Sequence, residues 1–516
     1  MARAGRSKRC HRVSTCDDAR VDVSLRTVIG TEIEYGITVQ NQADFNPVLA
    51  SSALINSYAG DRARIQWSFD EESPGRDARG FGFEDALPSE METGLVNVVL
   101  TNGARLYVDH AHPEFSTPEC FDPLEAALYD KAGEVVMARA VRAAQTLLPQ
   151  DQRMLVHKNN SDGKGNSYGA HENFLTSREL PFGEIVKHMT GFLATRQIFT
   201  GSGKVGAENG RPAVEFQISQ RADFFEEQVG LETTLKRPII NTRDEPHADP
   251  TRYRRLHVII GDATLSERQT FLKLGSLALL LQALEDGALP EPISLRDPVS
   301  SVWEISHDPS LSAAVELMDG THLTALEAQW QYLEWATKYL QQSELGEVYQ
   351  SVVDTWEEIL TTLETEPLAA ADRLDWVAKY RLLLGYRDRD GVTWDDSKLK
   401  LLSLQYHDVD PERGLYHRLV AGNRMQRLFD DAEIATAVTE PPERTRAYFR
   451  GRCVAKFRDS LVAANWDSLV FDTGEDALKR VPMMEPLRGS KARVGGLLDR
   501  SDTPAALLSA LGGNDG

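Results

Sequence analysis

The pattern of the chain changes near residue 265. Before this point, segments that alternate in polarity or are rich in β-branched residues are separated by polar loops, and one helical stretch, residues 122–147, lies among them. After it, apolar residues recur at three- and four-residue spacing, which predicts helices. The predicted strands cover 26–39, 96–112, 153–158, 213–220 and 254–261, and the later helices cover 266–286, 323–342, 345–364 and 369–385.

The length of 516 residues suits one large domain and a smaller one. A Pro441-Pro442 pair lies early in a final segment, about 431–516, that carries short helices, a strand near 466–471 and a glycine-rich tail. We expect this segment to form a small C-terminal domain behind a catalytic domain of residues 26–430.

Two segments cannot be assigned to a packed helix or strand over their whole length from the sequence. Residues 1–25 are basic but have no apolar core, so they are not a secretory signal, and we expect a disordered extension. Residues 41–92 are polar and acidic, and a helix at about 50–58 interrupts them. A loop of this length is usually functional or disordered, so we expect a partly mobile insertion near the active site.

Composition excludes several classes of protein. The net charge of −21 argues against nucleic acid and anionic membranes as partners. The four cysteines are scattered without a CxxC pair, which argues against a disulfide framework or a zinc site. There is no run of about 18 apolar residues that could span a bilayer. We expect a cytoplasmic monomer.

Glu32 and Glu34 form the first candidate site, in the run IGTEIEYG. Alternate residues of a strand share a face, so both carboxylates point the same way. Two adjacent carboxylates suit a hard cation such as Mg²⁺. A strand face that is simply solvated explains the same pattern.

A second candidate follows the Asn102-Gly103 hairpin signal. Arg105, Tyr107 and Asp109 occupy alternate positions of one strand and share a face, and Glu114 follows. Arginine suits phosphate, Asp109 can act as a nucleophile or general base, and Glu114 can complete a metal site. A structural Arg–Asp ion pair is the competing explanation.

The run KNNSDGKGNSYGAHENF, residues 158–174, combines three glycines with polar residues that include His171. The glycines permit close backbone approach to a nucleotide or metal, although a plain turn explains them too. The run TGSGKVG at 200–206 only resembles a phosphate loop, because Ile198 and Val205 stand where the Walker pattern requires Gly and Ser or Thr.

Residues 240–262 are dense in cations for an acidic chain, and Arg221 lies a short distance upstream. Such a cluster suits phosphate or carboxylate ligands. Salt bridges within the segment, to Asp244, Glu245 and Asp249, are the alternative. The cations are Arg243, Arg252, Arg254 and Arg255, with His247 and His257.

Together these segments resemble the family of Pup ligases and Pup deamidases/depupylases, which is related to glutamine synthetase and other carboxylate-amine ligases. The resemblance runs from about residue 26 to the C-terminus. Its clearest runs are GTEIEYGI, TNGARLYVDHAHPEFSTPEC, GKGNSYGAHENF, ISQRADF, INTRDEPHADPTRYRRLHVIIGD and EPLRGSKARVGGLLD. The form VDHAHPE and the long insertion containing WSFDEESPGRDARGF, 67–81, resemble the deamidase/depupylase branch.

The resemblance implies an α+β fold with a glutamine-synthetase-like curved antiparallel β-sheet cradle, flanked by helices, and a small C-terminal domain. It implies ATP, or ADP plus phosphate, and Mg²⁺ as cofactors. The catalytic residue would be Asp109. The metal ligands would be Glu32, Tyr107 and Glu114, with Glu34 beside them, and the nucleotide contacts would come from Arg105, Thr117, His171, Arg221, Arg243 and Trp466.

The activity implied by the resemblance is hydrolysis of the amide at the side chain of the C-terminal residue of Pup. This reaction releases ammonia from a C-terminal glutamine, or the lysine of a pupylated protein. Pup and pupylated proteins are the implied partners. Two alternatives remain, a Pup–protein ligase of the same fold and a non-catalytic Pup-binding protein.

Overall fold

The computed structural model describes residues 28–60, 65–69, 72–73, 75–80, 95–475 and 477–512. The extension predicted for residues 1–25 and several parts of the predicted insertion lie outside the described residues. None of the described helices is both long enough and apolar enough to cross a membrane.

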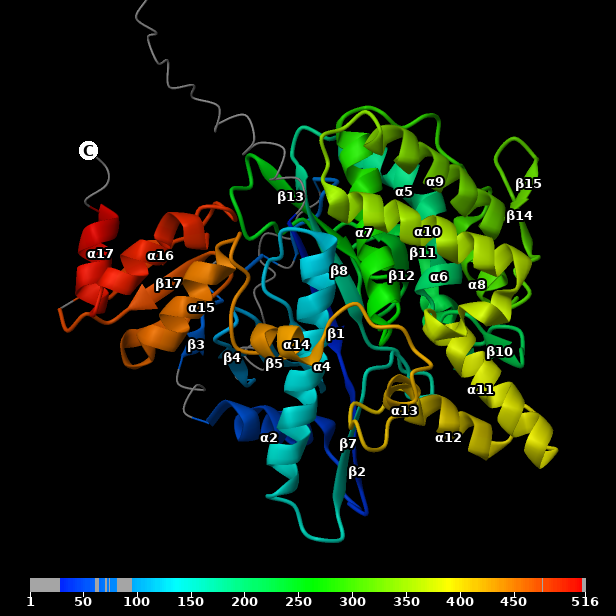
Figure 1. Ribbon diagram of the computed structural model, residues 1–516, viewed down its shortest axis with the longest axis horizontal. Helices are drawn as coiled ribbons and strands as arrows, with labels where there is room; N and C mark the ends of the chain where they lie inside the picture. Colours follow the sequence, from blue (N-terminus) through cyan, green and yellow to red (C-terminus); the bar gives the residue numbers. More distant parts are fainter. Residues whose placement is uncertain are drawn as a thin grey trace, which may run out of the picture.

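A six-stranded sheet in the order β13-β8-β1-β6-β5-β4 forms the centre of the molecule, and each neighbouring pair is antiparallel (Figure 1). The Asn102-Gly103 turn joins β4 to β5 as predicted, with Gly103 at a φ of 81°. The strands are β1 Ile29–Glu34, β4 Asn97–Val99, β5 Arg105–Asp109, β6 His112–Ser116, β8 Ala170–Ser177 and β13 Tyr253–Val258.

Two long helices pack on the sheet, α4 Pro123–Gln145 and α7 Glu267–Glu285. Asp122 caps α4 by accepting from the Glu125 amide, and Ser266 caps α7 by accepting from the Gln269 amide. Both helices bury most of their side chains between the sheet and the outer helices. One face of the sheet is therefore closed by apolar packing.

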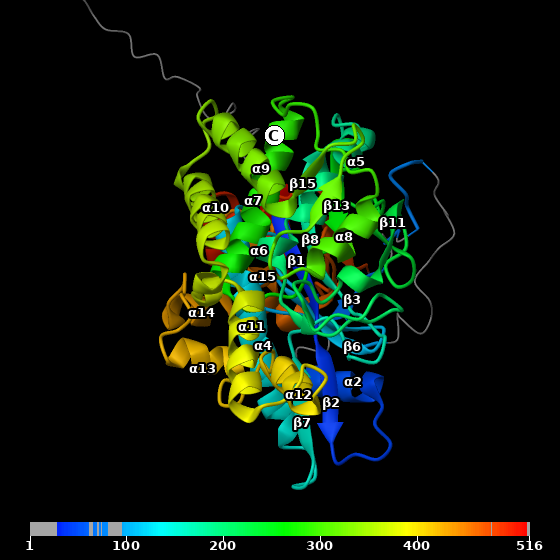
Figure 2. The same ribbon diagram turned by 90° about the vertical axis from the view of Figure 1, so that its right-hand side faces the viewer.

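The predicted strand 26–39 is divided in the structure. β1 ends at Glu34, and β2 Gly36–Gln40 leaves the sheet to pair with β7 Arg153–His157 (Figure 2). At the break, the Tyr35 amide donates to the Pro113 carbonyl and the Glu34 amide to the Gly169 carbonyl. A Cβ at position 36 would lie 2.3 Å from the Tyr168 hydroxyl, so only glycine permits this chain path.

The helical half follows the predicted periodicity with one correction. The predicted helix 369–385 is wrong at its start, because a 3₁₀ turn, η4 Pro367–Asp372, precedes α11 Asp375–Asp390. The Asp375 carboxylate accepts from the amides of Leu265 and Ser266, and its own amide donates to Gln269. These tertiary hydrogen bonds break the helix where local periodicity continues. The two other predicted helices correspond to α9 Ala325–Leu340 and α10 Glu347–Thr365.

The remaining elements are short. The predicted strand 213–220 is confirmed only at β10 Phe216–Gln217, which pairs with β9 Lys204–Val205. The others are β11 Phe225–Gly230, β12 Arg237–Asn241, β14 Ala314–Glu316, β15 His322–Thr324, α5 Phe182–Thr195, α6 Gln197–Thr200, α8 Pro298–Ser306, α12 Ser397–Gln405, α13 Leu415–Ala421, α14 Asp431–Ala437, η3 Ala222–Phe224 and η5 Arg458–Ser460.

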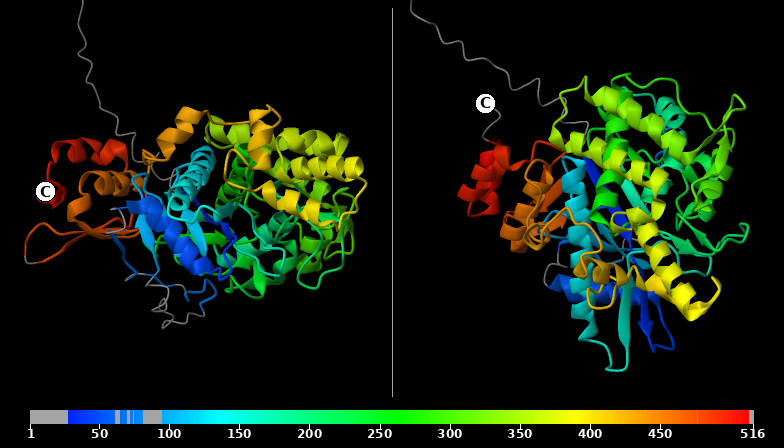
Figure 3. Two further views of the ribbon diagram at one scale, coloured as in Figure 1. Left: turned by 90° about the horizontal axis from the view of Figure 1, so that it is seen from below. Right: turned by 45° about the vertical axis from the view of Figure 1, so that its right-hand side comes forward.

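The C-terminal elements lie at one flank of the molecule and have their own apolar cluster (red and orange in Figure 3). A four-stranded sheet runs in the order β18-β17-β16-β3. α14 instead contributes Ile434 and Ala437 to the main core, so we propose a domain boundary nearer residue 440 than residue 431. The elements are β16 Leu461–Ala464, β17 Ser468–Phe471, β18 Lys479–Pro482, α15 Ala447–Lys456, α16 Lys491–Arg500 and α17 Pro504–Gly512.

Two pieces of the predicted insertion are packed. α2 Pro47–Ala59 buries Leu54 and Ile55 in the main core, and β3 Gln66–Trp67 pairs with β16. This segment therefore has a packing role that the sequence did not indicate. The mobility of the insertion stays a prediction.

Glu119 joins the C-terminal elements to the central sheet. Its carboxylate accepts from Arg446 at 2.7 Å and from Arg450. Burial raises the pKa of Glu119, but the two guanidinium groups outweigh burial and hold the pKa at about 2. Arg450 also donates to the Trp466 carbonyl, so this cluster fixes Trp466 relative to the sheet.

We expect Glu119→Gln to destabilise the docking of the C-terminal domain by about 3–5 kcal/mol, because two buried guanidinium groups lose their partner. The measurement is urea unfolding followed by tryptophan fluorescence. The exposed pair Arg452–Glu440 supplies the control, Glu440→Gln, with an expected cost below about 1 kcal/mol. Equal midpoints for the two variants would contradict this role.

The stability difference between the wild type and Glu119→Gln should depend on pH. The wild type should have the higher free energy of unfolding above pH 4.5, and the difference should disappear as the pH falls toward 2, since the pKa of Glu119 is depressed in the folded state.

Candidate active site

The registers of β1, β6 and β5 arrange the predicted site residues in layers. Glu32 pairs with Ser116, which pairs with Arg105, and Glu34 pairs with Glu114, which pairs with Tyr107. Asp109, opposite His112, forms the next layer. Five side chains of these strands line one cavity of about 1290 Å³, which confirms that they share a face. They are Glu32, Glu34, Arg105, Tyr107 and Asp109.

The first candidate metal site is made of Glu34, Asp109 and Glu114. One carboxylate oxygen from each lies within 4.8 Å of the others. Burial raises the pKa of Glu114 well above its usual value, and the nearby carboxylates of Asp109, Glu34 and Glu32 raise it further. A divalent cation would neutralise this repulsion, and oxygen ligands suit Mg²⁺.

Tyr107 lies beside this cluster. Its hydroxyl donates to the Glu114 carboxylate, and burial followed by the charge of Glu114 raises its pKa well above the usual range. Asp109 is at the open end of the strand, where about a third of its side chain is exposed, 3.0 Å from Nδ1 of His110. Asp109 can therefore reach a substrate in the cavity, whereas Glu114 is buried behind it.

The second candidate metal site is made of Glu32, His171 and His257, whose ligand atoms also lie within 4.8 Å of one another. Nδ1 of His257 is 2.9 Å from the Asn173 side-chain oxygen, while its buried Nε2 has no hydrogen-bond partner among the described residues. Burial, followed by the charges of Arg255 and His171, lowers the pKa of His257 well below 6.5. A neutral imidazole with one free nitrogen suits a metal ligand.

The family resemblance implies a different grouping, with His171 among the nucleotide contacts, His257 only in the cation cluster, and Glu32 as a metal ligand together with Glu114. In the structure the ligand atoms of Glu32 and Glu114 fall into different clusters. His257 joins this cluster because β13 pairs antiparallel with β8, where His257 lies opposite Asn173. Local patterning along the sequence does not reveal this pairing.

Arg105 lies between aromatic rings. Its guanidinium is 3.9 Å from the centre of the Trp67 ring and 3.8 Å from that of Tyr107, and it donates to the Asn97 side chain. Trp67 packs edge-on against Trp466 at 5.3 Å between ring centres. The C-terminal domain and the insertion thus complete the wall that carries the predicted nucleotide contacts Arg105 and Trp466.

Thr117 lies outside the main cavity. Its hydroxyl oxygen accepts from the Thr31 amide, and its side chain is buried. It lines a smaller adjoining cleft of about 80 Å³, together with Glu32, Arg255 and Trp466. The structure thus brings Thr117 close to Trp466 but not to Asp109.

The predicted cations divide into two groups. Arg221, Arg243 and Arg255 line the cavity, whereas Arg252 pairs with Glu485 and Arg254 lies against Asp244. The salt-bridge alternative therefore holds for Arg254, and Arg243 and Arg255 also lie within 4.0 Å of Glu245 while they line the cavity. The partner of Arg252 lies outside the segment.

Arg221 is 1% exposed, and no described carboxylate forms an ion pair with it. Its Nη1 donates to the Ile259 carbonyl, and its Nε lies 3.4 Å from the Ser167 hydroxyl. Burial, followed by the charge of Arg237, lowers the pKa of Arg221 to about 9. A buried guanidinium without a carboxylate partner on a cavity wall suits an anionic ligand.

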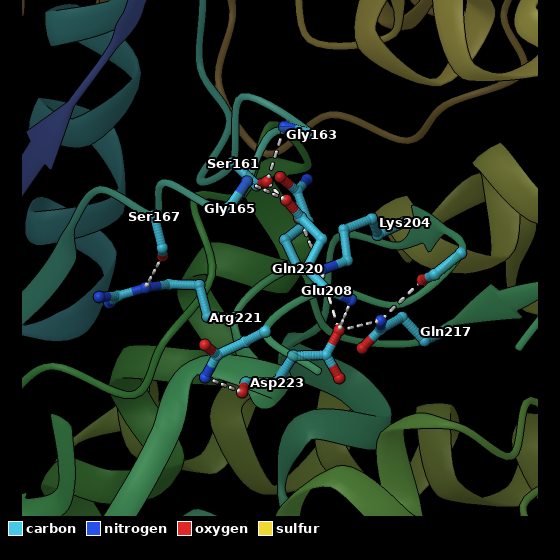
Figure 4. A network of polar contacts seen from close by, with 12 residues as sticks. Ser161, Gly163, Gly165, Ser167, Lys204, Glu208, Gln217, Gln220, Arg221 and Asp223 are labelled. Carbon is cyan, nitrogen blue, oxygen red and sulfur yellow. Dashed lines mark hydrogen bonds and ion pairs between the residues drawn. The ribbon is translucent and has the colours of Figure 1, made fainter. Parts of the chain in front are cut away.

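The glycine-rich run forms a loop, residues 161–169, along the rim of this cavity (Figure 4). Gly163 and Gly165 have φ of 69° and 99°, which favours glycine. The Gly169 amide donates to Glu34 at 2.8 Å, and a Cβ there would lie 2.6 Å from that carboxylate. The backbone at Gly169 thus approaches the Glu34 carboxylate closely, and the approach of this loop to a nucleotide or metal stays a prediction.

A protein family and several individual proteins match this chain in sequence. Residues 27–470 match the family described as Pup-ligase protein. The chain is 53% identical to the depupylase of Acidothermus cellulolyticus, over 95% of this chain and 100% of the relative. It is 49% identical to the Pup deamidase/depupylase of Mycolicibacterium smegmatis, over 94% and 100%, and 39% identical to a Pup–protein ligase of Acidimicrobium ferrooxidans, over 78% and 89%.

Solved structures agree with the mixed α+β fold. The ligase PafA in its complex with the prokaryotic ubiquitin-like protein Pup superposes with a TM-score of 0.79 at 30% identity, covering 95% of each chain. The Pup ligase PafA in complex with ADP superposes with a TM-score of 0.72 at 34% identity, covering 78% of this chain and 89% of the ligase. The family match over most of the chain and these near full-length relatives show that this chain belongs to the Pup-ligase protein family.

Proposed function

We propose that this chain is a depupylase and Pup deamidase that hydrolyses the amide at the side chain of the last residue of Pup. In a conjugate this amide is the isopeptide bond to a lysine, and in Pup ending in glutamine it is the terminal amide. The proposal rests on Asp109, whose side chain is about a third exposed in a large cavity beside the carboxylates of Glu34 and Glu114. The chain is also about half identical to depupylases over almost its full length.

Asp109 is the proposed catalytic residue. It either attacks the amide carbonyl or removes a proton from the attacking water. Its position at the open end of β5 gives its carboxylate access to the substrate, while Glu34 and Glu114 stay behind it. The positive charge of Arg221 on the cavity wall would favour negative charge that develops on the carbonyl oxygen.

ATP, or ADP with phosphate, and Mg²⁺ are the proposed cofactors. Glu34, Asp109 and Glu114 would hold one cation, and Glu32, His171 and His257 a second, which fits the unpartnered Nε2 of His257. Bound cations would supply positive charge beside the scissile amide. Arg105, Arg221, Arg243, Thr117 and Trp466 are the proposed nucleotide contacts, and we propose that the six-stranded sheet is the curved cradle of glutamine-synthetase-like enzymes.

The test is incubation of the purified protein with a pupylated protein, ATP and Mg²⁺. Release of free Pup and of the unmodified protein is the expected result. A second reaction with Pup ending in glutamine should release ammonia. New conjugates instead of free Pup would establish a ligase, and binding without turnover would establish a non-catalytic Pup-binding protein.

The ligase is the alternative with a specific observation behind it, because Pup–protein ligases share the family and the fold. They are 38–40% identical over 78% of this chain, whereas the depupylases are 49–53% identical over 94–95%. The higher sequence identity favours the hydrolase.

We predict that the nucleotide is required but not consumed once per turnover, because amide hydrolysis in water is downhill and needs no coupling to ATP. The measurement is the ratio of phosphate released to Pup released over many turnovers. A ratio far below one is the expected result. A strict one-to-one ratio would mean that hydrolysis of ATP drives the reaction, and the cofactor role proposed here would be wrong.

A further inference from the structure

Glu208 lies in the segment 201–210, which resembles a phosphate loop without having its pattern, and no role has been given to this segment so far. Its carboxylate lies between two groups of residues (Figure 4). On one side, the Ser161 hydroxyl donates to Oε2 at 2.5 Å and the Gly165 amide donates to Oε1 at 2.9 Å. On the other, Nζ of Lys204 donates to Oε2 at 3.0 Å. Glu208 therefore links the glycine loop 161–169 to the body of the protein.

The far side of this link is rigidly held. Lys204 also donates to Asp223 at 3.2 Å, and the Glu208 amide donates to the same carboxylate at 2.8 Å. Asp223 is fully buried and accepts in addition from Gln217 at 2.7 Å. Burial raises the pKa of Asp223, but its hydrogen bond with His307 and the charge of Lys204 outweigh burial and lower the pKa to about 2. Glu208 is thus anchored to a charged network in the interior.

The tip of the loop has few other anchors, although Ser167, behind the tip, accepts from Arg237 at 2.8 Å and from Arg221. Residues 162–166 are exposed, and their hydrogen bonds are mostly local: Asp162 accepts from the amides of Lys164 and Asn166. The Gly163 amide donates to the Ser161 hydroxyl, which itself donates to Glu208. The position of the loop tip relative to the cavity therefore depends on the Glu208 carboxylate.

The strand register shows which end of the cavity the glycine loop borders. Arg105, Glu32 and Trp466 lie at one end of the cavity, and Asp109 lies two layers away. The glycine loop approaches the sheet at the Glu34 layer, through the Gly169 amide. It therefore borders the layer next to Asp109, and the proposed nucleotide contact that it touches is Arg221, which also donates to the Ile259 carbonyl.

We propose that Glu208 is a positioning residue, which holds the glycine loop as the wall of the cavity that receives the polypeptide substrate. The proposal rests on the hydrolase function proposed above. Glu208 does not line the cavity, and it acts through Ser161 and Gly165. Its charge-assisted hydrogen bonds are the strong contacts of the loop tip, whereas Arg237 and Glu34 hold Ser167 and Gly169 at the end of the loop.

The test uses Glu208→Gln, which keeps the size of the side chain but weakens its bonds to the loop and to Lys204. We expect KM for a pupylated protein to rise about tenfold, with kcat and nucleotide affinity within about twofold of wild type, because the loss of one charge-assisted contact is worth roughly that factor. Ser161→Ala removes only one of the two anchors and should give a smaller change in the same direction. Glu215→Gln removes the same charge from an exposed position nearby and should change none of these quantities.

Trypsin supplies a readout that does not depend on activity. Lys164 is exposed at the loop tip, and Lys236 is exposed on another rim loop of the same cavity. In Glu208→Gln we expect faster cleavage after Lys164, with cleavage after Lys236 unchanged. This result would hold even if the wild-type protein proved not to release Pup, so failure of the function and failure of this proposal are distinguishable. Unchanged cleavage after Lys164, equally faster cleavage at both sites, or a fall in nucleotide affinity as large as the rise in KM would overturn it.

Discussion

Asp109→Asn is expected to reduce hydrolysis of pupylated protein by at least about 100-fold, the usual contribution of a positioned acid–base group or nucleophile. The substitution keeps the shape of the side chain but removes its basicity and most of its nucleophilicity. Nucleotide should still bind, because Arg105 and Trp466 lie at the other end of the cavity and Glu34 and Glu114 remain to hold the proposed cation. The measurement pairs single-turnover release of Pup with a nucleotide titration.

The matched control is Asp44→Asn, which makes the same chemical change at an exposed residue next to Phe45 on the cavity rim. Its rate should equal that of the wild type. If Asp109→Asn retained a tenth of the wild-type rate, Asp109 would not be the central residue of the reaction. If it lost nucleotide affinity in proportion to the rate, its main role would be as a ligand.

Glu114→Gln is expected to weaken Mg²⁺-dependent nucleotide binding by at least about tenfold, because it removes an anionic oxygen from a hard-cation site. Glu114 is buried and receives the Tyr107 hydroxyl, so the amide can keep the packing while losing the charge. The loss should be largest at low Mg²⁺ and should diminish as the cation concentration rises. Nucleotide titrations at several Mg²⁺ concentrations measure it.

Glu179→Gln, at an exposed position beyond the end of β8, is the control for charge removal and should bind nucleotide like the wild type. Glu32→Ala tests the second cluster and should also weaken binding. An unchanged affinity for Glu114→Gln across the Mg²⁺ range would exclude the cluster of Glu34, Asp109 and Glu114 as a cation site that supports the nucleotide.

Much of the site follows from local periodicity. Alternation along two strands was enough to predict that Glu32 and Glu34 share one face and that Arg105, Tyr107 and Asp109 share another, because the side-chain period of a strand is two. The structure confirms both and places the two faces in one cavity. The glycines of the 161–169 loop occupy positions that need glycine, with a positive φ at Gly163 and Gly165 and no room for a Cβ at Gly169, while their approach to a ligand stays a prediction.

Sequence alone therefore determined which residues share a face, where the five longest described helices lie and which loop needs glycine, because these depend on neighbours along the chain. Tertiary structure decided the rest. The pairing of β13 with β8 brings His257 to Glu32, the parallel pairing of β3 with β16 brings Trp67 to Arg105, and Asp375 breaks a helix through hydrogen bonds to residues 265 and 266. Each of these contacts joins residues more than about 30 positions apart, and a local pattern carries no information about which distant segment will pair with it.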